Sequence, residues 1–342
     1  MNIGINGYGR IGRIIHRIIS DSRDIRLVAI NDINPDINNI AYLANYDSTY
    51  GPLSDKYFAD GENIANTKRS ILCFSEDDIS KVNWQDQGVD LLIDSSGIEK
   101  NLFNSRNLKG KVKNIIFTNS PNESNVDKTI IFGVNHEDLN IAEDFLISSS
   151  ICDAIAFAPL AKLINDNFRI ERGFLTTLHP WLGYQNLLDG PSKAYAAPGK
   201  IHDEYALGRS SAMNLIPKST SAIDATCKVI PDLKEKFMSV SYRVPTNIVS
   251  SADSTIILKN SISKEEIAEL LIENEKKYPK IISNNFDALV SSDFIQNNAS
   301  VIVDHRFLET QDNFLKILSW YDNEWGYSSR VVDLINFIKK NI

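Results

Sequence analysis

The chain has 342 residues, enough for two domains on one polypeptide. Its composition, 43% hydrophobic and 23% charged, is that of a globular protein, and a net charge of −8 disfavours nucleic acid or an anionic membrane surface as a partner. No apolar run is long enough to span a bilayer, and a strand pattern begins at Asn2, so we expect neither a membrane span nor a secretory signal. Three widely spaced cysteines (73, 152 and 227) predict no disulfide framework and no metal site, and favour a cytoplasmic location.

The strongest local motif lies in residues 2–32, where a strand, a glycine-rich turn, an amphipathic helix and a second strand follow one another. The turn reads Gly7-Tyr8-Gly9-Arg10-Ile11-Gly12. Gly7 allows a tight turn, Gly9 allows the backbone to approach a pyrophosphate, and Gly12 allows the helix to pack on the strand. Arg10 and Ile11 lie at the helix start, whose amino terminus would face the phosphates. The motif predicts dinucleotide binding; the alternative is a βαβ unit whose glycines serve packing only.

Asp32 follows the second strand, twenty residues after Gly12. An acid at this spacing hydrogen-bonds the adenosine ribose hydroxyls and repels a 2′-phosphate, so we expect NAD rather than NADP. Ser96, in a turn after a predicted strand at 90–94, is suited to lie beside the cofactor. Further strands are expected at 70–74, 114–118 and 129–134. The pattern predicts a doubly wound Rossmann sheet in residues 1–150.

Cys152 stands at a predicted helix start. Three serines, at 148–150, precede a small-residue apolar run, and a serine there can accept hydrogen bonds from the first free backbone N–H groups. The partial positive charge of the helix end favours a thiolate, which is a strong nucleophile toward a carbonyl carbon. The alternative is a buried structural cysteine.

His179 is the candidate base. It ends a strand predicted over 175–179 and is followed by Pro180. A histidine at a strand end can project into a cleft, take a proton from a thiol and return it later. The alternative is that it only closes a strand edge.

The character of the chain changes after residue 150. Longer β-rich runs, a helix at 264–278 and an irregular Gly/Pro/Ala-rich loop at 186–210 predict a second, α+β domain over 151–324, with an antiparallel sheet and helices on one face. An amphipathic helix is expected at 325–342.

Seven short segments, in order along the whole chain, resemble motifs of the glyceraldehyde-3-phosphate dehydrogenases. They are residues 5–13, 29–32, 134–137, 158–162, 175–179, 243–246 and 320–327. The resemblance implies an NAD-binding domain, a catalytic domain, a carboxy-terminal helix that returns to the first domain and completes it, and a homotetramer. It also implies that Cys152 is the nucleophile, that His179 is the base and that Asn323 contacts the nicotinamide carboxamide.

The segments around the family's two phosphate sites depart from its pattern. The family has Ser-Cys-Thr-Thr-Asn-Cys where this chain has Ile-Cys-Asp-Ala-Ile-Ala, so Ile151 and Asp153 replace residues that hold inorganic phosphate. Residues that serve the substrate's own phosphate are replaced by Leu182, Tyr184 and Leu207. The candidate substrate-binding residues are the retained Thr220 and Arg243, together with Arg209 and Lys218.

These observations predict an NAD-dependent aldehyde dehydrogenase that works through a Cys152 thioester, with an altered substrate or acyl acceptor. One alternative is the ordinary phosphorylating reaction on glyceraldehyde 3-phosphate with a rebuilt phosphate site. Another is a non-catalytic NAD-binding paralogue. The retained pair of Cys152 and His179 disfavours the last, because a binding protein needs neither.

Overall fold

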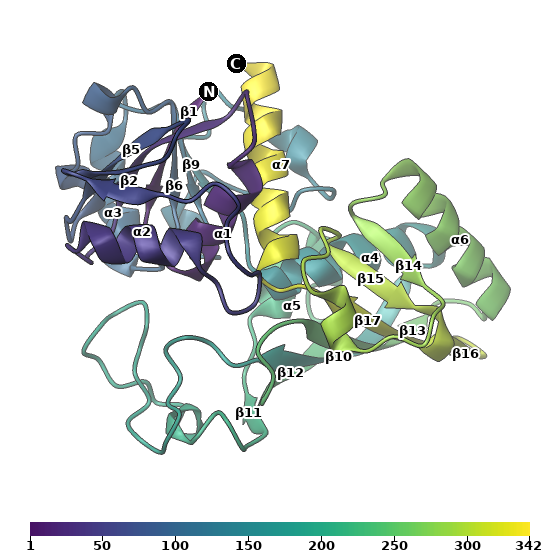
Figure 1. Ribbon diagram of the computed structural model, residues 1–342. Helices are drawn as coiled ribbons and strands as arrows, with labels where there is room; N and C mark the ends of the chain where they lie inside the picture. Colours follow the sequence, from purple (N-terminus) through teal and green to yellow (C-terminus); the bar gives the residue numbers. More distant parts are fainter. The chain divides into compact units, whose positions relative to one another are not determined.

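The computed structural model describes all 342 residues. The chain divides into two compact units (Figure 1). The first contains Met1–Phe132, His136–Ser150 and Ser328–Ile342, and the second contains Gly133–Asn135 and Ile151–Tyr327. No helix combines the length and apolar character that crossing a membrane requires.

The first unit is built on a nine-stranded sheet with the order β3-β4-β5-β2-β1-β6-β7-β9-β8. Its strands are β1 (Asn2–Asn6), β2 (Arg26–Asn31), β3 (Phe58–Asp60), β4 (Asn63–Ala65), β5 (Ser70–Phe74), β6 (Leu91–Asp94), β7 (Asn114–Phe117), β8 (Lys128–Thr129) and β9 (Leu146–Ser148). The seven strands β5-β2-β1-β6-β7-β9-β8 are parallel to one another, and the chain moves outward from β1 in both directions. This confirms the predicted doubly wound sheet. The strand expected at 129–134 is wrong, because regular pairing ends at Thr129.

Four helices belong wholly or mostly to this unit: α1 (Arg10–Ile19), α2 (Ile37–Asn45), α3 (Glu99–Asn104) and α7 (Trp325–Asn341). Helix α7 crosses the division of the chain, since its residues from Ser328 onward pack in the first unit. Buried apolar runs such as Leu91-Leu92-Ile93 account for the central strands, because a strand covered on both faces has no polar side.

The second unit contains a sheet of eight strands. They are β10 (Ile170–Pro180), β11 (Ile216–Lys218), β12 (Phe237–Val244), β13 (Ser250–Leu258), β14 (Ile282–Asn285), β15 (Val301–Asp304), β16 (Glu309–Gln311) and β17 (Phe314–Tyr321). The order is β11-β12-β10-β13-β17-β15-β14, and β16 pairs with β17. The prediction of antiparallel pairing holds for β10 with β13, for β11 with β12, and for β17 with each of β13, β15 and β16. It is wrong for β10 with β12 and for β14 with β15, which are parallel, so the sheet is mixed.

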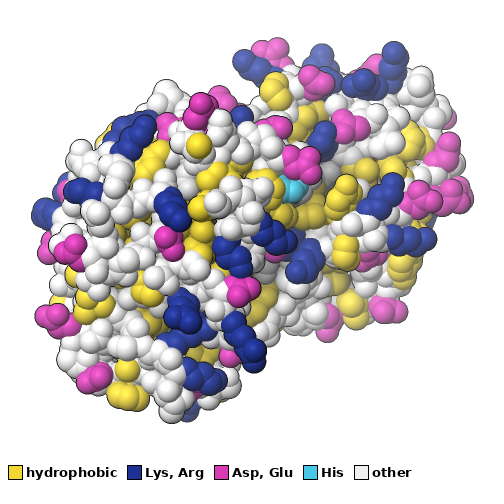
Figure 2. Space-filling view, turned by 90° about the horizontal axis from the view of Figure 1, so that it is seen from above, with side chains coloured by type: hydrophobic (Ala, Val, Ile, Leu, Met, Phe, Trp, Pro, Cys, Tyr) yellow, Lys and Arg dark blue, Asp and Glu magenta, His cyan; other side chains and the backbone are white.

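Helices α4 (Cys152–Phe168), α5 (Ala222–Cys227) and α6 (Lys264–Lys277) complete the second unit. Helix α6 begins with a reciprocal capping box between Ser263 and Glu266, so its start is defined locally. The loop at 186–210 has no regular structure apart from a short 3₁₀ helix at Tyr205–Gly208. On the face drawn in Figure 2, basic and acidic side chains intermix, so charges of opposite sign offset one another locally.

Candidate active site

The start of helix α4 places Cys152 as its first residue. The predicted serine cap is wrong: the residue before the helix is Ile151, and no side chain caps the helix. The serines instead secure the end of β9, where Ser148 Oγ donates to Asn119 O (2.6 Å) and Ser149 Oγ donates to Phe117 O (3.0 Å). Ser150 has a φ of 61°, which turns the chain just before the helix.

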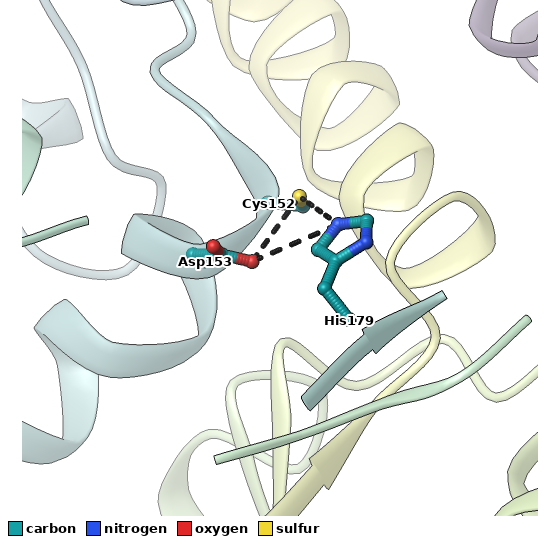
Figure 3. Close-up of side chains that lie close together, drawn as sticks. All are labelled: Cys152, Asp153 and His179. Carbon is teal, nitrogen blue, oxygen red and sulfur yellow. Dashed lines mark hydrogen bonds and ion pairs between the residues drawn. The ribbon is translucent and has the colours of Figure 1, made fainter. Parts of the chain in front are cut away.

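His179 lies near the end of β10, with its ring directed toward Cys152 (Figure 3). Its Nδ1 is 2.7 Å from the carbonyl oxygen of Pro180. A carbonyl oxygen can only accept, so Nδ1 carries the proton and Nε2 presents a lone pair. This Nε2 lies 3.6 Å from Cys152 Sγ, within reach for proton transfer from the thiol.

Asp153 completes a three-residue cluster. Its Oδ1 lies 3.5 Å from Cys152 Sγ and 3.9 Å from His179 Nε2 (Figure 3). The buried hydroxyl of Tyr321 donates to the same oxygen at 2.8 Å. Asp153 is recognisable in the sequence as a departure from the family's pattern, whereas Tyr321 was not predicted. The signal was present, because alternating burial along β17 puts Tyr321 on the same covered face as Leu315 and Ile317.

The surroundings of Cys152 and His179 shift the pKa of both groups. Burial, and then the Asp153 carboxylate, raises the pKa of the Cys152 thiol well above its usual range, while Arg243 opposes the rise. Burial, and then Arg243, lowers the pKa of His179 to about 4. The raised pKa is opposite in direction to the thiolate that the helix start predicts, and it corresponds to a thiol that faces a neutral imidazole at neutral pH.

The candidate substrate-binding residues differ in burial and in the partners that they already have. Arg243 lies opposite His179 in the β10–β12 pairing and is buried, and its Nε has no hydrogen-bond partner. Lys218, on β11, is near enough for Arg243 to lower its pKa, after the larger effect of burial. Thr220 Oγ1 accepts from Ala222 N at 3.2 Å, next to the start of α5. Arg209 is exposed and pairs with Asp189 within the long loop, at 2.8 Å.

The glycine-rich turn has the shape that a dinucleotide requires. Gly7 has a φ of +88°, and a Cβ there would lie 2.5 Å from the backbone of Ser96. A Cβ on Gly12 would lie 2.4 Å from Gly7 O, whereas a Cβ on Gly9 would meet nothing within 4 Å. The open space is thus beside Gly9, the residue before the uncapped amino terminus of α1.

The other candidate cofactor residues divide into two groups. Asp32 is partly exposed, and its carboxylate accepts from the backbone of Tyr8 (2.6 Å) and Asn34 (2.9 Å), which leaves lone pairs for ribose hydroxyls. Asn323 is buried in the second unit, and its Oδ1 has no partner, which fits an amide donor of nicotinamide.

The side chains of Arg10 and Ser96 are already bonded to protein groups: Arg10 pairs with Asp47, and Ser96 Oγ donates to Asp94 Oδ1 at 2.6 Å. Ile11 is half-buried in α1, so it contributes to such a site through its backbone.

Known proteins resemble this chain along nearly its whole length. Residues 1–102 match the family model described as "Glyceraldehyde 3-phosphate dehydrogenase, NAD binding domain", and residues 151–323 match the corresponding "C-terminal domain". The chain is 38% identical over 343 residues to "Glyceraldehyde-3-phosphate dehydrogenase, cytosolic" of Chlamydomonas reinhardtii, covering 99% of this chain and 97% of that protein. It is 36% identical over 343 residues to "Glyceraldehyde-3-phosphate dehydrogenase 1" of Bacillus subtilis, covering 99% and 98%. The chain therefore belongs to the glyceraldehyde-3-phosphate dehydrogenase family of NAD-dependent oxidoreductases, which act on an aldehyde group.

Proposed function

We propose that this protein oxidises an aldehyde through a thioester on Cys152 and passes the acyl group to an acceptor other than inorganic phosphate. The thiol of Cys152 gives its proton to His179 Nε2 and adds to the aldehyde carbonyl, and the resulting alkoxide takes that proton from Nε2, which leaves the imidazole neutral again. The pair of atoms that begins this step lies 3.6 Å apart.

The second step is loss of a hydride from the tetrahedral adduct. His179 Nε2 takes the hydroxyl proton as the carbonyl re-forms, which leaves a thioester on Cys152. NAD, when bound, supplies the hydride acceptor. The Nδ1–H of His179 remains bonded to Pro180 O, so the ring keeps its orientation while Nε2 takes and gives protons.

The position of Asp153 carries the proposal for the acceptor. Its Oδ1 lies 3.5 Å from Sγ, so an anion that attacks the thioester carbon must approach a carboxylate. Two like charges 5 Å apart repel by about 3 kcal/mol at an effective dielectric constant of about 20, and a doubly charged phosphate by roughly twice that. One hydrogen bond from Thr220 returns about 1.5–3 kcal/mol. A neutral acceptor, such as water, meets no such repulsion, and the product is then a carboxylic acid.

Arg243 favours a second candidate function, the ordinary phosphorylating reaction on glyceraldehyde 3-phosphate. A buried guanidinium whose Nε lacks a partner is a ready receptor for an anion. Its field also lowers the pKa of both Cys152 and His179 relative to burial alone, so it lies close to the reacting atoms. In the first candidate, Arg243 would bind an anionic group of the aldehyde itself; in the second, a phosphate.

A rapid-mixing experiment with NAD and a panel of aldehydes separates the two. We expect one NADH per chain in a first burst, followed by release of the acyl group at a rate that does not depend on phosphate concentration. A large, saturable acceleration by phosphate, with efficient use of glyceraldehyde 3-phosphate, would establish the ordinary reaction instead. Cys152→Ser should abolish the burst and keep NAD binding, whereas Cys227→Ser, on helix α5, should retain it.

Two further properties belong to the same proposal. We assign the protein to the cytoplasm, the compartment in the printed name of its Chlamydomonas relative. We also assign it a homotetrameric state.

A further inference from the structure

The catalytic cluster contains three different metal-binding groups that face one another. They are a thiol, an imidazole and a carboxylate, and their nearest ligand atoms all lie within 4.8 Å of one another (Figure 3). Asp153 and His179 are buried, and Cys152 is partly exposed. Solvent therefore reaches the cluster at Cys152, while the other two groups are covered by protein.

We propose that Cys152, Asp153 and His179 form a zinc-binding site, and that a zinc ion bound there reversibly inhibits the enzyme. Zinc binds sulfur at about 2.3 Å and nitrogen or oxygen at about 2.0–2.1 Å; in a tetrahedron this requires about 3.5–3.6 Å from sulfur to either other ligand and about 3.3–3.4 Å between those two. The observed separations are 3.5 Å for Sγ–Oδ1, 3.6 Å for Sγ–Nε2 and 3.9 Å for Nε2–Oδ1. Two of the three edges already match, and the third needs to close by about 0.5 Å.

The surroundings of two ligands are those of a prepared metal site. Metal-binding histidines usually donate their second ring N–H to a carbonyl or carboxylate, which fixes the tautomer. His179 does this through Nδ1 to Pro180 O at 2.7 Å, so the Nε2 lone pair points toward the other two ligands. The hydroxyl of Tyr321 donates to Asp153 Oδ1 at 2.8 Å, which orients the carboxylate and leaves a further lone pair of this oxygen for the metal.

The charges of the cluster also suit a divalent cation. Binding displaces the thiol proton to solvent, so that a thiolate, a carboxylate and a neutral imidazole surround Zn²⁺ with no net charge. Arg243 and Lys218, whose charges act on Cys152 or Asp153, oppose an isolated cation but meet a neutral complex. The S, N and O donor set favours zinc over magnesium or calcium, which prefer oxygen alone.

The consequence for catalysis follows from which lone pairs the metal uses. Zinc on Sγ occupies the lone pair that would attack the aldehyde, and zinc on Nε2 occupies the lone pair that would accept the proton. A bound ion therefore blocks turnover without changing the fold. Three protein ligands leave a fourth position open to water or to a chelator, unlike the closed four-ligand sites of structural zinc. A chelator should therefore restore activity.

The test is a zinc titration of the chelator-treated full chain, using competition with a chromophoric chelator and needing no turnover. We expect one zinc per chain and, with cobalt as a probe, the thiolate-to-cobalt absorption band of a four-coordinate site. Asp153→Asn should weaken zinc at least tenfold, and Cys152→Ser should abolish the cobalt band. Asp166→Asn is the matched control, because Asp166 is an exposed carboxylate on the same helix that pairs with Lys162; its affinity should equal that of the parent.

A thermal-unfolding profile like the parent's shows that each variant is folded, because the substituted residues all lie in the second unit. Tyr321→Phe supplies a second probe, because it keeps all three ligands and removes only the hydrogen bond that orients Asp153; a smaller loss of affinity is expected. Equal zinc affinity for the parent and Asp153→Asn, or a cobalt spectrum without the thiolate band, would overturn the proposal. Because the readout is binding, this result is independent of which acyl acceptor the enzyme uses.

Discussion

Asp153 Oδ1 and Cys152 Sγ belong to consecutive residues of one helix and yet lie 3.5 Å apart. Successive side chains of an α-helix point about 100° away from each other, so neighbours in sequence do not normally meet. Here the buried hydroxyl of Tyr321 holds the same carboxylate oxygen at 2.8 Å. The contact gives the Cys152 thiol a second acceptor for its proton besides His179.

The first prediction concerns the pH dependence of the thiol. The carboxylate of Asp153 disfavours a neighbouring thiolate and raises the pKa of Cys152. Asp153→Asn removes the like charge, so the pKa should fall and the rise in alkylation rate should move to lower pH. The measurement is the rate of iodoacetamide labelling of Cys152 between pH 6 and 10. Asp166→Asn should leave the profile unchanged; an Asp153→Asn profile that coincides with the parent's would show that burial alone protects the thiol.

This prediction changes how slow labelling is to be interpreted. A sluggish thiol at neutral pH would not identify a non-catalytic NAD-binding paralogue, because an active cluster with a raised thiol pKa behaves in the same way. Only the NADH burst with an aldehyde separates those two classes.

The second prediction concerns cofactor choice. Asp32→Ala removes acceptors for the ribose hydroxyls and a charge that repels a 2′-phosphate. NAD affinity should fall by roughly 10–150-fold, the equivalent of the about 1.5–3 kcal/mol of a hydrogen bond to a charged group, while NADP affinity should rise relative to NAD. Fluorescence titration with both nucleotides gives the ratio. Asp32 also accepts from Tyr8 N, so Asp32→Asn, which keeps an acceptor there, is the control for the shape of the turn. A parent protein that binds NADP as tightly as NAD would contradict this role.

The parts of the fold that the sequence predicted are those defined by local spacing. The glycine turn, its flanking strands and Asp32 lie within residues 2–32, and period-2 or period-3.6 patterns define most other elements. The parallel pairing of β10 with β12 was missed because it depends on how a long connection returns to the sheet, and no local pattern records that.

In the candidate site too, features that depend on neighbouring residues were predicted, and features that depend on distant residues were not. The predicted position of Cys152 at a helix start agrees with the structure, whereas the predicted serine cap and the predicted lowering of the thiol pKa do not. The serines bond to Phe117 and Asn119 instead of the helix, and Tyr321, which orients Asp153, is 168 residues away from it. Burial of a thiol is produced by such distant neighbours, so the helix dipole alone gave the wrong direction for its pKa.

The third prediction separates two glycines of one motif. A Cβ at position 12 would lie 2.4 Å from Gly7 O, so Gly12→Ala should destabilise the first unit by about 1–3 kcal/mol. A Cβ at position 9 meets no protein atom within 4 Å, and φ there is −73°, so Gly9→Ala should unfold like the parent. Gly9→Ala should nevertheless weaken NAD binding, because its methyl group would occupy the space in which we expect the pyrophosphate to bind. Thermal unfolding and NAD titration on both variants check this; normal NAD affinity for Gly9→Ala would place the phosphates elsewhere.

The fourth prediction concerns acid stability. His16 is buried between the hydroxyls of Tyr8 (2.6 Å) and Tyr57 (3.2 Å), and burial lowers its pKa from 6.5 to about 3. The unfolded chain therefore binds one more proton than the folded chain between those pH values. The contribution of His16 to the free energy of unfolding is therefore fully present above pH 6.5. It decreases by about 1.4 kcal/mol for each pH unit below that value.

Native-state hydrogen exchange of amides in β1, measured from pH 6.5 to 4, gives that slope. His16→Gln cannot titrate and should lose this part of the pH dependence, although its stability at pH 7 is lower. His179→Gln serves as the comparison, because its titration belongs to the second unit. An unchanged slope in His16→Gln would mean that carboxylates alone account for acid unfolding.

The last prediction is that the protein assembles as a homotetramer. Strands β10 and β12 expose apolar side chains at neighbouring positions: Phe174 pairs in register with Met238, and they are 56% and 62% exposed. The long loop adds Leu187, Leu188 and Tyr205, each at least 70% exposed. Apolar groups concentrated on one sheet and one loop are typical of surfaces that another subunit covers. Light scattering should give four times the 38.4 kDa chain mass. Met238→Lys should shift the protein to smaller species, whereas Lys316→Met, a change of the opposite sense on β17 in the same sheet, should not. A monomeric parent at working concentration would refute the assembly and leave these apolar residues unexplained.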